Sequence, residues 1–292
     1  MSSSWFLAGQ EGFEVSLKYE QSVKVPSADD LGANEVLVKM HSASLNYREL
    51  IIARGGITGP ITVPVVPGCD GAGVVEAVGS AVKDFRVEDR VVTYFAPRLV
   101  DTSGDDALAG IADILSTLGQ GTDGTLRSKG VFPETALVHA PKSLGWLPAA
   151  TLACTWTTAW NSLFGIKGKE AGPGAWVLIQ GTGGVSIATL QLAAAVGATV
   201  VATTSTDDKA ARLTAMGATH TVNYRSNPDN WAQEARNLTP DKRGFDIVVD
   251  IAGNETPAQS LAAARVDGVG PCQSKKYEIR LDMMLRAFPV GV

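Results

Sequence analysis

Trp176-Val177-Leu178-Ile179-Gln180-Gly181-Thr182-Gly183-Gly184-Val185-Ser186 is the stretch that decides the fold of the second half of this chain. An apolar run of strand length ends at Gly181 and passes directly into an Ala-rich helical pattern, which is the context that a dinucleotide-binding fingerprint requires. Gly181 would form the tight turn, and Gly183 would let the backbone approach a pyrophosphate. Gly184 and Val185 would begin the helix whose N-terminal N–H groups face that anion.

Strand and helix patterns alternate from this stretch onward. Each predicted helix follows a predicted strand, at the spacing of a parallel sheet. The strands are predicted at 175–180, 199–203, 219–222 and 245–250, and the helices at 184–196, 207–216, 228–238 and 255–264. Four β–α units in this order predict an α/β fold with a doubly wound parallel sheet.

The first half of the chain has a different pattern, with short strands separated by turn residues. Residues 35–40 alternate charged and apolar side chains, as in a half-buried strand. Residues 68–79 combine four glycines with small and β-branched residues, which indicates strands with bulges and close backbone approach. Together these patterns predict an antiparallel, partly closed β domain.

Composition excludes several classes of function. The 292 residues are enough for two domains, and a net charge of −5 without a basic face makes nucleic acid an unexpected partner. No apolar run reaches the ~18 residues of a membrane span, and the N-terminus has no signal-peptide pattern. Three cysteines cannot form a disulfide framework, so we expect a cytoplasmic protein that binds a small molecule.

Four motifs in the same order and spacing resemble the medium-chain dehydrogenase/reductase superfamily, most closely its quinone-oxidoreductase-like, zinc-type alcohol dehydrogenase-like branch. They are Asn46-Tyr47-Arg48-Glu49-Leu50, Gly68-x-Asp70-x-Ala72-Gly73, Ala149-Ala150-Thr151-Leu152-x-Cys154 with Thr158-Ala159-Trp160, and the glycine-rich turn. The resemblance implies a GroES-like substrate domain at 1–146, a Rossmann domain at 147–268 and NAD(P)-dependent oxidoreduction.

The last 24 residues, 269–292, form an atypical tail. The family pattern stops after Gly268, whereas relatives continue with a fifth and a sixth Rossmann strand. We therefore expect an incomplete sheet, and a homodimer weakened by the missing strands, because a strand of that region often pairs subunits in the family. An unpaired edge strand also favours aggregation.

Zinc is not expected, because the zinc positions of the resembled family are mostly changed. Asn46 stands at the first Cys position, Cys69 at the His position and Asp70 at the Glu position, and only Cys154 keeps the ligand type. Two interpretations remain: Cys69, Asp70 and Cys154 form a three-ligand set, or the cysteines are small buried residues. We favour the second, and no Cys lies between 70 and 153 to form the family's structural zinc lobe.

Without a metal, hydride transfer depends on positioning and on hydrogen-bond donors. Asn46 and Tyr47 match the stretch that lines the family's substrate site, so they are candidates for orienting substrate or donating a proton, and we place Asp70 with them as a catalytic candidate. Structural alternatives are that Asn46 only satisfies loop backbone groups and that Arg48 pairs with Glu49 or Asp70.

NADPH is the predicted cofactor, because no acidic residue ends the second strand of the parallel sheet. Thr204 stands where an acid would bind the ribose of NAD, and Ser205 offers a hydroxyl beside it. Lys209 and Tyr224 match a pair that NADPH-dependent relatives use. The alternative for Lys209 is a solvated helix charge.

Two further matches come from the resemblance. Thr158 matches a threonine near the nicotinamide, and Asp250 lies at the end of the fourth strand, where it could instead cap the next helix. The sequence thus predicts an NADPH-dependent reductase of quinones, enones or other activated carbonyls and double bonds. The alternatives are a zinc-dependent alcohol dehydrogenase and a cofactor-binding but catalytically silent protein.

Overall fold

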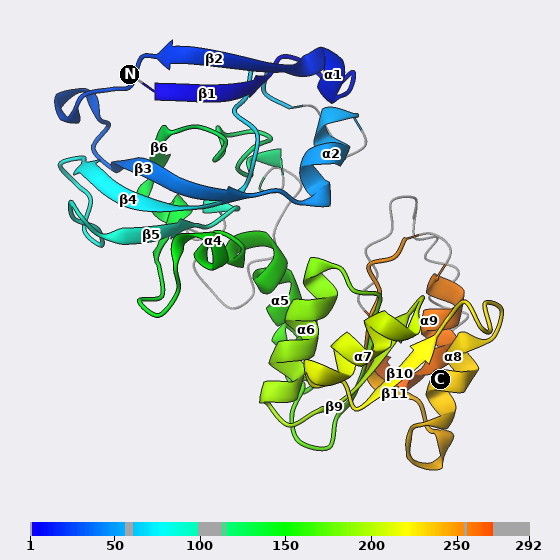
Figure 1. Cartoon of the computed structure of the whole chain (residues 1–292). Helices are drawn as coiled ribbons and strands as arrows, with labels where there is room; N and C mark the ends of the chain where they lie inside the picture. Colours follow the sequence, from blue (N-terminus) through cyan, green and yellow to red (C-terminus); the bar gives the residue numbers. More distant parts are fainter. Residues whose placement is uncertain (1, 56–60, 99–112, 114, 254–255, 271–292) are drawn as a thin grey trace, which may run out of the picture. The chain divides into compact units, whose positions relative to one another are not determined.

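The computed structural model describes residues 2–55, 61–98, 113, 115–253 and 256–270. These residues form two compact units, Met1–Thr157 and Thr158–Val292 (Figure 1). The boundary falls later than the sequence patterns placed it, because the helical residues after 145 pack on two strands of the first unit. Of the 269–292 tail, residues 271–292 lie outside the described residues.

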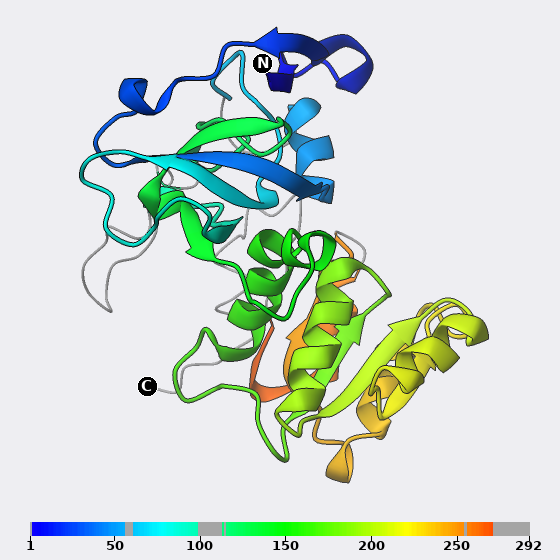
Figure 2. The same cartoon turned by 60° about the vertical axis from the view of Figure 1, so that its left-hand side comes forward.

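The first unit contains a five-stranded antiparallel sheet in the order β6-β3-β4-β5-β7 (Figures 1 and 2). Its strands are β3 (Glu35–Ser44), β4 (Asp70–Val78), β5 (Arg90–Thr93), β6 (Lys129–Pro133) and β7 (Leu137–His139). A separate antiparallel hairpin is formed by β1 (Ser2–Leu7) and β2 (Leu17–Val23). The predicted antiparallel β domain is confirmed.

Short helical segments connect these strands. They are α1 (Phe13–Ser16), η1 (Ala28–Asp30), α2 (Tyr47–Ala53), η3 (Glu134–Ala136), α4 (Trp146–Ala149) and the π-helical turn η4 (Leu152–Trp156), which continues into α5 (Thr157–Phe164). The turn η3 divides β6 from β7, and there Glu134 Oε1 accepts the backbone N–H groups of Lys83 and Asp84 at 2.7 Å.

Close packing between β3 and β4 explains the glycines of this region. A Cβ on Gly73 would lie 2.3 Å from the carbonyl oxygen of Lys39, so no larger residue fits there. The pairing is irregular between Leu37 and Val38 and again between Met40 and Ser42, as the glycine-rich pattern indicated. Inward-facing side chains of β3 pack with Phe132 of β6 in the core of this unit.

The second unit is a five-stranded parallel sheet in the order β10-β9-β8-β11-β12. Its strands are β8 (Trp176–Gln180), β9 (Thr199–Thr204), β10 (His220–Asn223), β11 (Phe245–Val249) and β12 (Ala264–Val269). Its later helices are α6 (Gly184–Ala195), α7 (Asp207–Ala215), α8 (Trp231–Asn237), η5 (Pro240–Lys242) and α9 (Pro257–Ala263). The predicted doubly wound sheet is confirmed.

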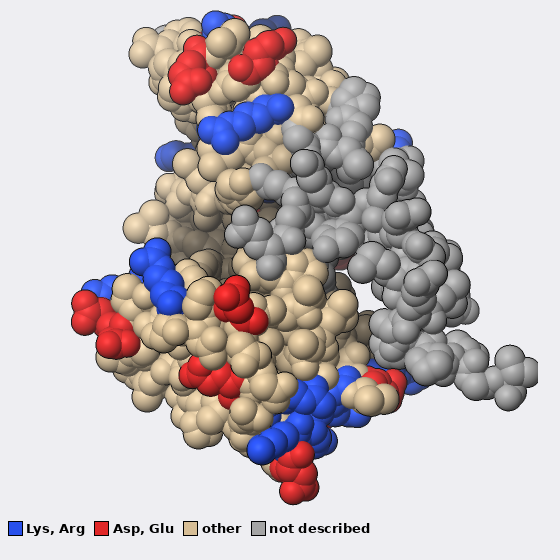
Figure 3. All heavy atoms as spheres, turned by 90° about the vertical axis from the view of Figure 1, so that its right-hand side faces the viewer, with Lys and Arg blue, Asp and Glu red and all other residues tan. Residues whose placement is uncertain are grey.

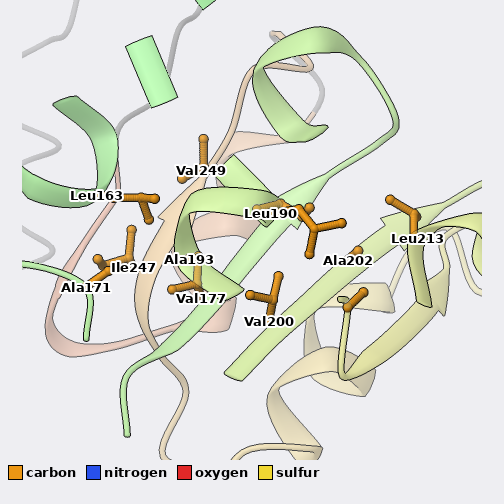
Figure 4. Packing of buried hydrophobic residues seen from close by; sticks show 12 residues of the cluster. Leu163, Ala171, Val177, Leu190, Ala193, Val200, Ala202, Leu213, Ile247 and Val249 are labelled. Carbon is orange, nitrogen blue, oxygen red and sulfur yellow. The ribbon is translucent and has the colours of Figure 1, made fainter. Parts of the chain in front are cut away.

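Successive residues of the central strands face opposite layers. Val177 and Ile179 of β8 pack against α6 and α7, where Leu190 and Leu213 belong to the same cluster (Figure 4). Leu178 points the other way, into a cluster with residues of α8 and α9. A strand buried on both faces needs the continuous apolar run that residues 177–179 supply.

Two elements differ from the sequence patterns by more than two residues. The fifth strand, β12, was missed, because its Asp267 has a φ of 65° and its pairing with β11 is irregular. Helix α8 begins at Trp231 rather than at 228, because Asn230 has non-helical angles of −145° and 19°. Gly197 and Gly217 do end their helices with φ values of 80° and 111°, as predicted.

The strand order places a topological switch point between β8 and β11. From β8 the chain moves outward to β9 and β10, and it then returns to the other side of β8 through β11 and β12. Ligands of such sheets bind outside the carboxyl ends of the strands at this point. The face in Figure 3 carries basic and acidic side chains near one another. In the part of the chain that is described, no helix has the length and apolarity needed to cross a membrane.

Candidate active site

In the first unit, Asn46 and Asp70 form the centre of a buried polar network. Asp70 begins β4 and is 0% exposed. Its Oδ2 accepts a 2.9 Å hydrogen bond from Asn46 Nδ2, and its Oδ1 accepts the backbone N–H of Cys154 at 2.7 Å. Thr155 donates its hydroxyl to Asn46 Oδ1 at 3.2 Å. The network thus joins the start of β4, the start of α2 and the π-helical turn η4.

Glu49 extends this network on the other side. Its Oε2 accepts the backbone N–H of Asn46 at 2.6 Å, as the third residue of a capping box does. Its Oε1 accepts the thiol of Cys69 at 3.5 Å and lies 3.9 Å from Arg48 Nη1. The Arg48–Glu49 pair is therefore present, and Arg48 also donates to the carbonyl oxygen of Leu118 at 3.0 Å.

Burial controls the charge of the acidic groups here. It raises the pKa of Asp70 to about 6, while the hydrogen bonds from Asn46 and from the Cys154 backbone act in the opposite direction. The neighbouring Cys154 thiol, burial and the nearby carboxylates raise the pKa of the Cys69 thiol well above its usual range. Without a metal, Cys69 is therefore a neutral thiol at pH 7.

The donor atoms at the family's zinc positions do not fit a zinc site. Asn46 supplies an amide in place of a thiolate, and both oxygens of Asp70 already accept hydrogen bonds. Among the described residues, no three His, Cys, Asp or Glu side chains are arranged so that they could hold a metal ion. Cys69 belongs to the buried core of the first unit, and Cys154 packs against that core.

Tyr47 is the third predicted catalytic residue. It is the first residue of α2 and follows Asn46 directly, and its side chain is 58% exposed. Asn46 precedes the helix in an extended conformation, with φ −113° and ψ 163°. The hydrogen bonds that hold Asn46 therefore also fix the position from which Tyr47 projects.

In the second unit, the glycine-rich turn has the geometry that the sequence indicates. Gly181 has a φ of 76°, and a Cβ placed on it would meet no atom within 4 Å. Gly183 precedes α6, and the helix start lacks a side-chain cap. The first-turn amides, from Gly184 and Val185 onward, therefore face outward without intrahelical partners. This arrangement fits a pyrophosphate.

The predicted cofactor-specificity residues lie at the same edge of the sheet. Thr204 ends β9, is 1% exposed, and accepts the backbone N–H of Tyr224 at 3.0 Å. Ser205 follows it and is half-buried. Lys209 lies exposed in the first turn of α7, where its backbone N–H is bonded to Thr206 Oγ1 at 3.4 Å. Thr204, Ser205 and Tyr224 thus adjoin one another, and Lys209 lies one turn into the following helix.

Thr158 and Asp250 lie on other elements of the second unit. Thr158 is in α5, half-buried, and its carbonyl oxygen accepts the hydroxyl of Ser162. Asp250 follows β11, but it does not cap α9: its carboxylate accepts from the Ala252 N–H and from two hydroxyls. Glu49, Thr155 and Ser260 were missed as site residues, because each contributes through a long-range hydrogen bond that a single sequence does not reveal.

Comparison with known proteins identifies both units. Residues 32–142 match the family model described as the alcohol dehydrogenase GroES-like domain, and residues 184–270 match that of a zinc-binding dehydrogenase. A zinc-type alcohol dehydrogenase-like protein of Schizosaccharomyces pombe is 44% identical over 82% of this chain and 67% of its own length. Mouse quinone oxidoreductase is 28% identical over 84% of this chain and 65% of its own length.

Solved structures share the fold over nearly the whole chain. The crystal structure of an NAD-dependent alcohol dehydrogenase is 32% identical and superimposes with a TM-score of 0.77, covering 96% of this chain and 80% of that one.

Proposed function

The chain belongs to the medium-chain dehydrogenase/reductase superfamily of NAD(P)-dependent oxidoreductases, and we propose that it is an NADPH-dependent reductase that acts without a metal. Its substrates would be small quinones, enones or other activated carbonyls and double bonds. The hydrogen bond between Asn46 and Asp70 carries this proposal. It joins an amide and a carboxyl group at two of the positions where zinc-dependent relatives have their zinc-site residues.

The preference for NADPH is supported by the end of β9. Thr204 offers no carboxylate that would bind the 2′-hydroxyl of NADH or repel the 2′-phosphate of NADPH. Lys209 adds a positive charge nearby, and Tyr224 and Ser205 add hydroxyl groups. One 32% identical structure is that of an enzyme named for NAD, so both nucleotides have to be compared.

The first unit supplies positioning and a proton donor. When bound, the nicotinamide supplies a hydride to an electrophilic carbon of the substrate. An acceptor without a metal partner needs a hydrogen bond to the oxygen where negative charge develops. We assign that donor to Tyr47, whose side chain is exposed at the start of α2. Asn46 and Asp70 would then hold the start of α2 in place.

The test is a comparison of reduction rates with two nucleotides and two substrates. Purified protein is mixed with NADPH or NADH and with 1,4-benzoquinone or 2-cyclohexenone, before and after dialysis against EDTA, and zinc content is measured. We expect NADPH to support the higher kcat/KM, with less than about 0.1 zinc per chain and no loss after EDTA. Tyr47→Phe should lower kcat, while Tyr19→Phe, an exposed tyrosine of β2, should not.

The opposite result would identify a different enzyme. One zinc per chain, together with alcohol oxidation that EDTA abolishes, would make this protein a zinc-dependent alcohol dehydrogenase. A folded chain that binds NADPH but reduces neither substrate class would be the catalytically silent alternative.

A further inference from the structure

A buried polar network lies beneath the glycine-rich turn of the second unit. Asp250, at the carboxyl end of β11, is 1% exposed. Its Oδ2 accepts the hydroxyl of Ser260 at 2.6 Å, and its Oδ1 accepts the hydroxyl of Thr256 at 2.8 Å and the N–H of Ala252 at 3.0 Å. Ser260 in turn accepts the side-chain N–H of Gln180, the last residue of β8.

Gln180 directly precedes Gly181, so this network reaches the first residue of the turn. The backbone oxygen of Gln180 also accepts the hydroxyl of Ser186 at 2.7 Å, and the N–H of Gly181 is bonded to the carbonyl oxygen of Thr203 at 3.0 Å. The turn is therefore held at both ends: at Gln180 through Ser260, and at Ser186 in the first turn of α6.

A second connection runs through the residue after Asp250. The Cδ1 atom of Ile251 is the nearest atom to a Cβ placed on Gly183, at 4.0 Å. The bond from Asp250 Oδ1 to the Ala252 N–H fixes the backbone around Ile251. Asp250 is therefore connected to Gly181, which forms the tight turn, through Ser260 and Gln180, and it fixes the backbone beside Ile251, the nearest neighbour of Gly183.

We propose that Asp250 is a positioning residue for nucleotide binding, which keeps the 181–186 turn in its binding conformation through Ser260 and Gln180. This inference rests on the proposed binding of NADPH. A carboxylate with three donors is well stabilised when buried, and a network with every partner satisfied gives a single arrangement. A turn that is already ordered does not have to be ordered by the ligand, which improves affinity.

The same strand offers a matched control. Asp246, near the amino end of β11, also accepts three hydrogen bonds, from the Trp176 N–H at 2.8 Å, Arg243 at 2.9 Å and Arg265 at 2.6 Å. It lies at the opposite edge of the sheet from the glycine-rich turn. Loss of a hydrogen-bonded carboxylate at one end of β11 is thus common to Asp246→Asn and Asp250→Asn, and only the second touches the turn.

The test measures nucleotide affinity and the dynamics of the turn separately. We expect Asp250→Asn to raise the Kd for NADPH about tenfold, Ser260→Ala to raise it by a similar factor, and Asp246→Asn to change it less than about twofold. In the nucleotide-free protein, hydrogen exchange of the Gly181 amide, which is bonded to the carbonyl oxygen of Thr203, should become at least about tenfold faster in Asp250→Asn than in Asp246→Asn.

Equal effects of the two Asn variants on exchange in this turn would overturn the positioning role. Failure of the wild-type chain to bind NADPH or NADH would overturn the proposed function instead, and the exchange comparison would still decide whether Asp250 orders the turn. Asp250→Glu keeps the charge but lengthens the side chain. Relative to Asp250→Asn, it should restore the unfolding temperature more completely than it restores the affinity for NADPH.

Discussion

The side-chain nitrogen of Asn46 lies 2.9 Å from Oδ2 of Asp70, a residue 24 positions later in the chain. This contact fixes which way the amide points, because its oxygen accepts the hydroxyl of Thr155 on the opposite side. Asn46 thus connects the start of α2, through hydrogen bonds, to the start of β4 and to the π-helical turn η4. At this position zinc-dependent relatives would have a cysteine ligand.

Removal of this amide should destabilise the first unit. In Asn46→Ala, Asp70 Oδ1 keeps the backbone N–H of Cys154 but Oδ2 loses its side-chain donor, and a buried carboxylate oxygen without a donor is costly. We expect the free energy of unfolding to fall by about 1–3 kcal/mol in urea titrations followed by circular dichroism. The exposed Asn34→Ala serves as control and should change it by less than about 0.5 kcal/mol. An equal loss of unfolding free energy in both variants would show that the Asn46–Asp70 hydrogen bond does not stabilise the first unit.

Asp70 should make stability decrease with rising pH. Because burial raises the pKa of Asp70 from 3.8 to about 6, the folded state binds more protons than the unfolded state between these values. This group's contribution therefore falls by about 3 kcal/mol from about pH 3 to about pH 7. Carboxylates with a lowered pKa, such as Glu11 and Asp30, act in the opposite sense, so the difference between wild type and Asp70→Asn has to be measured.

The control for this pH effect is Asp29→Asn, which removes an exposed carboxylate of the same unit. The difference between wild type and Asp70→Asn should slope downward with pH across this window, and more steeply than the difference for Asp29→Asn. A flat difference for Asp70→Asn would mean that Asp70 has the same pKa in the folded and the unfolded chain.

The strands and helices of the second unit were predictable because their signals are local. The apolar run at 177–179 is buried on both faces, and Gly197 and Gly217 end helices with positive φ. The residues of the candidate site were predictable only where they belong to a sequence motif of the family. Glu49 and Ser260 act through partners 20 and 10 positions away, and such contacts depend on how the strands pair. The strand β12 was not predicted, because it contains Asp267, whose positive φ is a conformation that the sequence does not indicate.

Lys209 should distinguish NADPH from NADH. The side chain is exposed in the first turn of α7, which follows β9, so its removal should leave the fold intact. We expect Lys209→Ala to raise the Kd for NADPH about tenfold in a tryptophan-fluorescence titration, and to change that for NADH by less than about twofold. Lys242→Ala, beside the amino end of β11, is the control. A parallel loss of affinity for both nucleotides would remove Lys209 from the specificity site and leave it as a solvated helix charge.

Substitution of Gly181 and of Gly183 should separate the cost of backbone strain in the turn from the loss of contact with the nucleotide. Gly181 has a φ of 76°, so Gly181→Ala should cost about 1 kcal/mol of folding free energy in addition to any effect on binding. Gly183 has ordinary angles of −75° and 171°, and its added Cβ would meet only Ile251 at 4.0 Å. Gly183→Ala should therefore keep the wild-type unfolding temperature but weaken NADPH binding by more than tenfold, because the new methyl group takes the space of the pyrophosphate. Gly172→Ala, with no atom within 4 Å and no positive φ, should change neither quantity. If Gly183→Ala binds NADPH like wild type, the pyrophosphate does not approach this turn.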